Sequence, residues 1–299
     1  MELGVGLPTS GAWATPANMR RIAGRAEELG YRSLWTFQRL LHPLDTEWGP
    51  EYHAVNDPVT ALAYVAGLTS RIRLGIAVVN IPYYAPIVLA KALTTLDIVS
   101  AGRLDVGLGL GWSPLEFTAA GVPFERRGAR AEEFIRCLAT IWTDPEAGFH
   151  GDFYALPPSR VEPKPIQSPH PPLLLGGSAD AALRRVGRLA DGWISSSRAD
   201  LGALGSSIEV VRTAARQAGR DPAALRFVVR GVVRLGSTAE RRPLQGTAGQ
   251  IRSDLAALEA SGVTEVFFDL NWDPRVTAAE TDPAWTTDYA EELLAELAP

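Results

Sequence analysis

Short apolar runs alternate with longer amphipathic segments along the whole chain. The runs lack the polar alternation of a half-exposed strand, and several are rich in β-branched residues. This is the pattern of strands buried on both faces of a parallel sheet. We expect eight such strands, over residues 3–7, 33–36, 72–79, 104–110, 173–175, 192–195, 226–235 and 263–270.

The segments between the runs carry apolar positions at helical spacing. Proline at the first turn and glycine after the last mark several of them, as Pro86 and Gly102 do around residues 86–99. Helices are also expected over 15–29, 59–69, 116–120, 130–142, 179–190, 204–217, 248–260 and 283–297.

Eight strand–helix repeats predict a single α/β domain over residues 1–299, a (β/α)8 TIM barrel. The segment 145–172 is rich in proline and aromatic residues, with a short hairpin expected over 149–154. We interpret it as an insertion before the fifth strand, because the repeats resume directly after it. A doubly wound open sheet with a second domain is the alternative, but no glycine fingerprint for a dinucleotide follows the first strand.

The composition excludes several classes of function. The net charge of −5 gives no basic field for nucleic acid or an anionic membrane. No signal-peptide pattern and no apolar run near the ~20 residues of a membrane span is present, so we expect a cytoplasmic protein. The single cysteine, Cys137, excludes an intrachain disulfide, and the four scattered histidines predict no metal site.

Glycines alternate along the fourth expected strand, at Gly107, Gly109 and Gly111, and Trp112 follows. Alternate residues of a strand share a face, so these glycines predict a stripe free of side chains on which a flat group can lie. Tight packing inside the barrel is the alternative reading.

Gly176, Gly177 and Ser178 stand between the fifth strand and a helix. Outward-pointing amides and a helix N-terminus attract anions, which favours a phosphate as the ligand. The alternative is an ordinary tight turn.

Several motifs together resemble the bacterial luciferase-like family, and in particular its F420-dependent oxidoreductase branch. They are Arg103–Trp112 with Glu116-Phe117 and Gly121–Phe124, then Glu162–Pro165, Pro171-Pro172, Gly176–Ser178 and Ala190–Trp193. Members are (β/α)8 barrels with a long insertion, are often homodimers, and bind a flavin or the deazaflavin coenzyme F420 at the C-terminal mouth.

The resemblance implies a cofactor site residue by residue. Gly109, Gly111 and Trp112 would line the deazaflavin pocket, and Gly176, Gly177 and Ser178 would hold the cofactor phosphate. Ala77-Val78 matches the place where deazaflavin members carry a cis non-prolyl bulge against the ring.

The chain departs from the family after the second strand. Deazaflavin members often have Asp-His there, the histidine acting as acid or base, whereas this chain has Gln38-Arg39. Arginine stays protonated and cannot shuttle a proton, but it can hold negative charge on the cofactor or substrate. We therefore expect Gln38 to contact the cofactor, Arg39 to act electrostatically in catalysis, and His42 to be the alternative proton donor. Trp112 also replaces a glutamate of related enzymes.

The sequence thus predicts an F420-dependent oxidoreductase that transfers a hydride to or from a small organic substrate. An FMN-dependent monooxygenase and an F420-binding protein without turnover are the alternatives. Aromatic residues on the expected mouth loops favour a flat or apolar substrate, and they are Trp13, Trp48, Tyr52, Tyr83 and Tyr84. A homodimer is expected, and neither nucleic acid nor membrane is expected as a partner.

Overall fold

The computed structural model describes residues 1–236 and 241–299. Eight parallel strands form a closed barrel: β1 (Glu2–Gly6), β2 (Ser33–Thr36), β3 (Arg73–Ile76), β5 (Leu104–Gly109), β8 (Leu173–Gly176), β9 (Gly192–Ile194), β10 (Arg226–Gly231) and β13 (Glu265–Phe268). They pair in that order, β13 pairs with β1, and the β3–β5 pairing completes the ring. The predicted (β/α)8 TIM barrel is confirmed.

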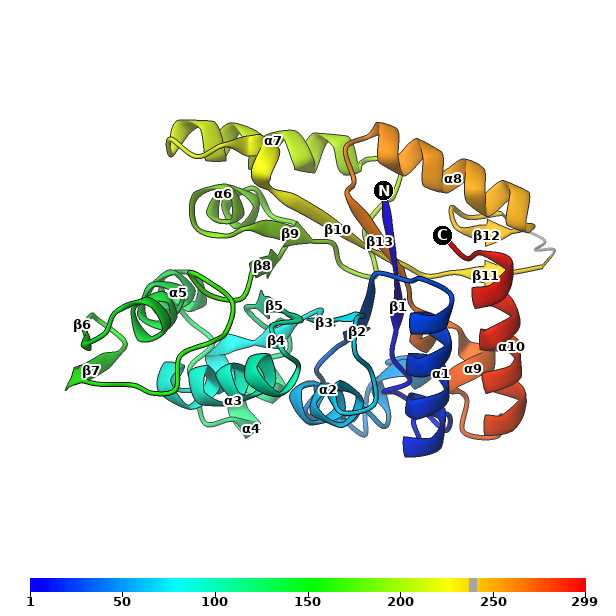
Figure 1. Cartoon of the computed structure of the whole chain (residues 1–299), viewed down its shortest axis with the longest axis horizontal. Helices are drawn as coiled ribbons and strands as arrows, with labels where there is room; N and C mark the ends of the chain where they lie inside the picture. The colour runs from blue at the N-terminus through cyan, green and yellow to red at the C-terminus, as the bar shows by residue number, and fades with distance from the viewer. Residues whose placement is uncertain (237–240) are drawn as a thin grey trace.

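Helices surround the barrel (Figure 1). The longer ones are α1 (Pro16–Glu28), α2 (Pro58–Ala66), α3 (Pro86–Val99), α5 (Arg127–Thr143), α6 (Asp180–Leu189), α7 (Leu204–Gln217), α8 (Ala248–Ala260) and α10 (Pro283–Glu296). The short ones are α4 (Pro114–Ala119), α9 (Pro274–Thr277) and the 3-10 turns η1 (Pro50–Tyr52), η2 (Ile81–Tyr83), η3 (Pro222–Ala224) and η4 (Leu270–Trp272). Side-chain caps begin several helices, as Thr15 does for α1 and Asp57 for α2.

Two expected strands are shorter than the apolar runs that predicted them. The run over 72–79 is divided, because the chain leaves the ladder after β3 at a cis Ala77–Val78 peptide and pairs again only in β4 (Val79–Asn80). The run over 226–235 ends as a barrel strand at Gly231. Its remainder includes the fully buried Val233 and the separate strand β11 (Arg234–Leu235), which pairs with β12 (Gln245–Gly246). The apolar runs therefore predicted strands that are too long, because residues beyond the ends of these strands are buried without belonging to the barrel sheet.

The segment 145–172 lies between α5 and β8. It contains the antiparallel pair β6 (Ala147–His150) and β7 (Ala155–Ser159), which stands at the opposite end of the molecule from α8 and α10 (Figure 1). Its later part is attached to the barrel by Gln167, whose amide donates to the Asp97 carboxylate and to the Leu104 carbonyl, each at 2.7 Å.

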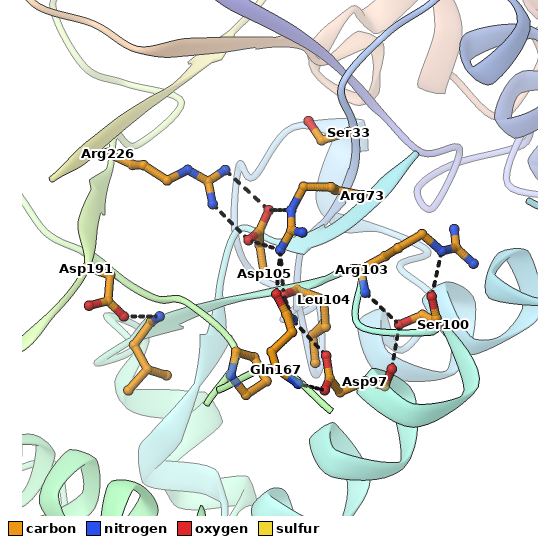
Figure 2. Close-up of polar contacts among 12 residues, drawn as sticks. Ser33, Arg73, Asp97, Ser100, Arg103, Leu104, Asp105, Gln167, Asp191 and Arg226 are labelled. Carbon is orange, nitrogen blue, oxygen red and sulfur yellow. Dashed lines mark hydrogen bonds and ion pairs between the residues drawn. The ribbon is translucent and has the colours of Figure 1, made fainter. Parts of the chain in front are cut away.

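A charged cluster fills the N-terminal end of the barrel, opposite the mouth. Figure 2 shows Arg73 and Arg226 converging on Asp105, which accepts from them at 2.7 and 2.8 Å. Arg226 also donates to Glu265 at 2.8 Å. Burial alone would raise the pKa of Asp105, but the two guanidinium groups outweigh it, so the pKa is held below its usual range. These ion pairs stabilise the N-terminal end of the barrel.

No helix among the described residues is long and apolar enough to cross a membrane.

Candidate active site

A cavity of about 670 Å³ opens at the C-terminal ends of the barrel strands. Parallel strands deliver their following loops to this one face, where barrel enzymes place their chemistry. Ten residues predicted from sequence line it: Gln38, Arg39, Ala77, Val78, Gly109, Gly111, Trp112, Gly176, Gly177 and Ser178. The structure therefore brings together residues from four separate strand ends of the chain.

Val78 forms the floor of the cavity. It packs on the cluster inside the barrel, in which the rings of Trp35 and Phe267 stack at 5.3 Å. The cis peptide expected at Ala77–Val78 is present. A Cβ on Gly109 would lie 2.3 Å from Val78 Cγ2, and one on Gly176 would lie 3.3 Å from Val78 Cγ1. These glycines make room for Val78, which gives the cavity an apolar floor.

The glycine stripe predicted from sequence is thus only partly a bare surface. A Cβ on Gly107 would lie 1.9 Å from the Ile76 carbonyl oxygen, so that glycine serves close packing inside the barrel, as the alternative reading held. Gly111 has a φ of +69°, and a Cβ there would lie 2.8 Å from the Tyr83 hydroxyl. Of the three glycines, Gly109 and Gly111 line the cavity.

The turn Gly176–Ser178 precedes α6 and faces the cavity. Gly177 has a φ of +143°, and a Cβ on it would lie 2.6 Å from Ala182 Cβ of the helix. The indole of Trp193 donates to the Gly177 carbonyl at 2.7 Å, which fixes the loop. The turn therefore fits an anionic group approached by backbone amides at a helix N-terminus.

Arg39 forms a buried ion pair with Glu116 of α4. Glu116 also accepts from the Leu40 amide at 2.7 Å and from the Tyr83 hydroxyl at 3.1 Å. Burial and the nearby Glu116 charge raise the pKa of Tyr83, which keeps its phenol protonated. The Arg39 guanidinium, the Leu40 amide and the Tyr83 hydroxyl thus all bind the Glu116 carboxylate, which does not itself line the cavity.

The Arg39 guanidinium is enclosed by three aromatic rings. Its central carbon lies 5.3 Å from the Trp48 ring, 5.5 Å from Tyr52 and 4.8 Å from Trp112. Its buried Nε makes no hydrogen bond within the described residues. Through these cation–π contacts Arg39 connects the long loop over residues 43–56, which carries Trp48 and Tyr52, with Trp112.

His42 is not among the cavity residues. Its ring lies 4.0 Å from that of His53 and 5.8 Å from that of Trp48. The structure therefore brings Arg39 to the cavity and leaves His42 outside its lining.

The other aromatic residues expected at the mouth have separate roles. Trp13 is completely buried. The side-chain amide of Gln38 donates to the Tyr84 hydroxyl at 2.6 Å, and the side-chain carbonyl of Gln38 accepts from the backbone amide of Asn80 at 2.8 Å. Gln38 is thereby fixed, and Asn80 is a polar cavity residue that the sequence reasoning did not single out.

Arg230 is the main site residue that the sequence reasoning missed. It lies near the end of β10 beneath the cavity, donates to the Ala77 carbonyl and pairs with Asp269 at 2.7 Å. Its guanidinium carbon lies 4.1 Å from the Trp272 ring. Burial lowers the pKa of Arg230 and raises that of Asp269, although each partner opposes the shift of the other. The sequence did carry a signal for this residue, because Arg230 is a charged residue within an apolar run that predicts a strand.

The rim of the cavity is basic. Arg126 and Arg127 stand at the start of α5, and Arg185 comes from α6. Arg126 pairs with Asp152 at 3.2 Å, and Arg185 with Glu132 at 3.2 Å. Among the described lining residues there are five arginines and no aspartate, glutamate, lysine or histidine. Four of these arginines pair with carboxylates outside the lining, and Arg127 is the one that has no ion-pair partner among the described residues. No group of side chains suited to a metal ion occurs in the described ranges.

Comparisons with known proteins agree with this geometry. The monooxygenase RslO1 of Streptomyces bottropensis has a similar fold, with a TM-score of 0.83 and 24% identity over 99% of this chain and 98% of that one. The FMNH2-dependent dimethylsulfone monooxygenase of Pseudomonas putida is 34% identical over 160 residues, which are 52% of this chain and 42% of that protein.

The F420-dependent glucose-6-phosphate dehydrogenase of Amycolatopsis mediterranei is 32% identical over 202 residues, which are 65% of this chain and 58% of that protein. The relatives thus include users of both cofactors. The sequence model of the luciferase-like monooxygenase family matches residues 1–245. The chain belongs to the luciferase-like monooxygenase family.

Proposed function

We propose that the cavity binds coenzyme F420 and that the protein is an F420-dependent oxidoreductase acting on a small organic substrate. The observation that carries this is the lining: an apolar floor at Val78, a glycine turn before a helix at Gly177, and a rim on which Arg127 has no ion-pair partner among the described residues. When bound, F420 supplies two-electron hydride chemistry at the carbon that replaces the flavin N5.

Charge favours F420 over FMN. FMN ends at one phosphate, whereas F420 continues into a tail that carries several carboxylates. Arg126 and Arg127 line the same cavity as the Gly176–Ser178 turn, so they are available to a tail that continues from the phosphate. Arg127 makes no ion pair within the described residues and stands 4.0 Å from the Phe124 ring. A basic rim of this kind matches a polyanionic tail better than a single phosphate.

The residues of the chain then have definite tasks. Gly177 and Ser178 bind the phosphate, Val78 supports the ring, and the wall held by Arg39 excludes water from it. Arg230, which is paired with Asp269, fixes the Ala77 carbonyl beneath the floor. No described lining residue is a conventional proton donor near neutral pH, so the proton comes from water or from the substrate itself.

An FMN-dependent monooxygenase is the second candidate, because the dimethylsulfone monooxygenase relative uses FMNH2. The test is to titrate the protein with F420 and with FMN, following the fluorescence of tryptophans such as Trp112 and Trp272 in the cavity. We expect F420 to bind more tightly, and the difference to shrink with added salt because rim charges are screened.

Hydride transfer is tested separately, from the absorbance of reduced and oxidised F420 in a substrate screen. Tighter FMN binding together with oxygen consumption by reduced FMN would overturn the proposal in favour of a monooxygenase. Tight F420 binding without exchange across a broad screen would indicate a cofactor-binding protein without turnover.

A further inference from the structure

A second cavity of about 680 Å³ adjoins the cofactor cavity. It is built by the loops that follow β9, β10 and β13, and it shares Ser197, Arg230 and Trp272 with the first cavity. Because Arg230 bonds the Ala77 carbonyl of the cofactor floor, the two cavities meet at the edge of this floor. A molecule in the second cavity can therefore reach the shared residues Ser197, Arg230 and Trp272.

The walls of this cavity are basic in a protein whose net charge is −5. Four arginines line it, Arg198, Arg230, Arg234 and Arg242, against the single carboxylate Asp200. A cleft lined by one sign of charge concentrates ligands of the opposite sign.

The four arginines of this cavity differ in how far neighbouring carboxylates neutralise their charge. Arg230 pairs with Asp269 and donates to the Ala77 carbonyl. Arg234 Nε lies 3.7 Å from Asp273, within ion-pair distance, and makes no hydrogen bond among the described residues. Arg198 and Arg242 have no ion-pair partner in the part of the chain that the structure describes. Unused guanidinium donors of this kind match an oxyanion, which they can bind in bidentate fashion.

The remaining wall is apolar, with Leu201, Val232, Pro243 and Trp272. A cavity with an apolar side and a cationic side selects an organic anion over a free inorganic one. We propose that this cavity is the substrate pocket and that the substrate is a small organic anion: a carboxylate, a sulfonate or a phosphate ester. Its anionic group lies against Arg198 and Arg242, and its reacting carbon lies at the Arg230–Trp272 wall. The assignment as a substrate pocket rests on the proposed function.

The test measures anion binding itself by calorimetry, with benzenesulfonate as probe and neutral benzenesulfonamide as its matched analogue. We expect the sulfonate to bind, the sulfonamide to bind far more weakly, and binding of the sulfonate to persist when F420 is saturating. Arg198→Gln and Arg242→Gln should each weaken it about threefold, since both contacts are partly screened by solvent. Arg216→Gln, an exposed arginine of α7 outside both cavities, is the control and should change nothing.

Equal binding of the two probes, or unchanged affinity in both arginine variants, would overturn the proposal. Competition between benzenesulfonate and F420 would also overturn it, because the anion would then occupy the phosphate turn. Absence of F420 binding with arginine-dependent sulfonate binding intact would count against the proposed function while supporting the anion site.

Discussion

Arg39 and Glu116 form an ion pair in which 3% of the Arg39 side chain and none of the Glu116 side chain is exposed. The pair joins the loop after β2 to α4, and the loop aromatics gather around its guanidinium. The charge of Arg39 is thus neutralised by a partner, so Arg39 acts by shaping the cavity wall more than as a free cation.

Removing one partner leaves a buried charge unpaired. Glu116→Gln should therefore lower the free energy of unfolding by about 3–5 kcal/mol in urea denaturation. F420 affinity should fall as well, because the wall with Trp112 loosens. Glu209→Gln breaks the exposed pair with Arg216 and is the control, with stability nearly unchanged. A Glu116→Gln variant as stable as its parent would show that the pair is not structural.

A substitution at Gly177 tests whether the turn Gly176–Ser178 binds the cofactor phosphate. Its φ is +143°, and a Cβ added there would come within 2.6 Å of Ala182 Cβ, so no room is left for a side chain. Gly177→Val should weaken F420 binding at least about tenfold, or about 1.4 kcal/mol, in the fluorescence titration. Gly249→Val is the matched control, because a Cβ at Gly249 on α8 meets nothing within 4 Å. An unchanged dissociation constant, in a folded variant, would remove the turn from the site.

Local sequence predicted the barrel and ten of the residues that line the cavity, because strand ends and glycine turns carry their geometry in their own residues. Gly177 is such a case: its conformation and its place before a helix are both local. Arg230 is the opposite case. Its role depends on Asp269 and on the Ala77 carbonyl, 39 and 153 positions away. The pairing of Arg39 with Glu116 spans 77 positions and was missed for the same reason.

His42 lies outside the cavity lining, so it should not be the proton donor. His42→Gln is expected to keep the turnover and the shape of the pH profile of the parent. His53→Gln, which changes the ring beside it, serves as the comparison. Lost turnover with cofactor binding retained in His42→Gln alone would instead make His42 the acid.

Asp105 should make stability depend on pH. Its pKa is lower in the folded protein than in the unfolded chain, so its contribution is complete above the unfolded pKa of about 3.9 and is lost as pH falls through the folded value. Asp105→Asn leaves Arg73 unpaired and should cost about 3–5 kcal/mol at pH 7.

The difference in unfolding free energy between parent and Asp105→Asn should stay constant from pH 7 to about 5 and shrink below about 4. Asp288→Asn removes an exposed partner of Arg21 and should show little difference at any pH. A difference for Asp105→Asn that grows toward low pH would contradict the assigned direction of the shift.

Two apolar side chains of α3 are exposed. Val88 is 61% exposed and Val99 55%, and the neighbouring α2 with the turn after it adds Tyr64 and Leu68, which are 37% and 40% exposed. Apolar side chains grouped on adjacent helices are typical of a surface that another chain covers. We propose that the homodimer expected from the sequence forms through this face of α2 and α3, in an isologous contact about a two-fold axis.

In such a contact each substitution acts twice, once from each subunit. Val88→Arg should therefore convert a dimer to a monomer in sedimentation velocity, because two cations would be placed in one apolar contact. F420 binding per chain should be retained, since no α3 residue lines the cavity in the described ranges. Ala260→Arg, at the exposed end of α8, adds the same charge elsewhere and should leave the dimer intact. If both variants sediment like the parent as dimers, the contact lies on another face. A parent that sediments as a monomer at all concentrations would remove the dimer itself.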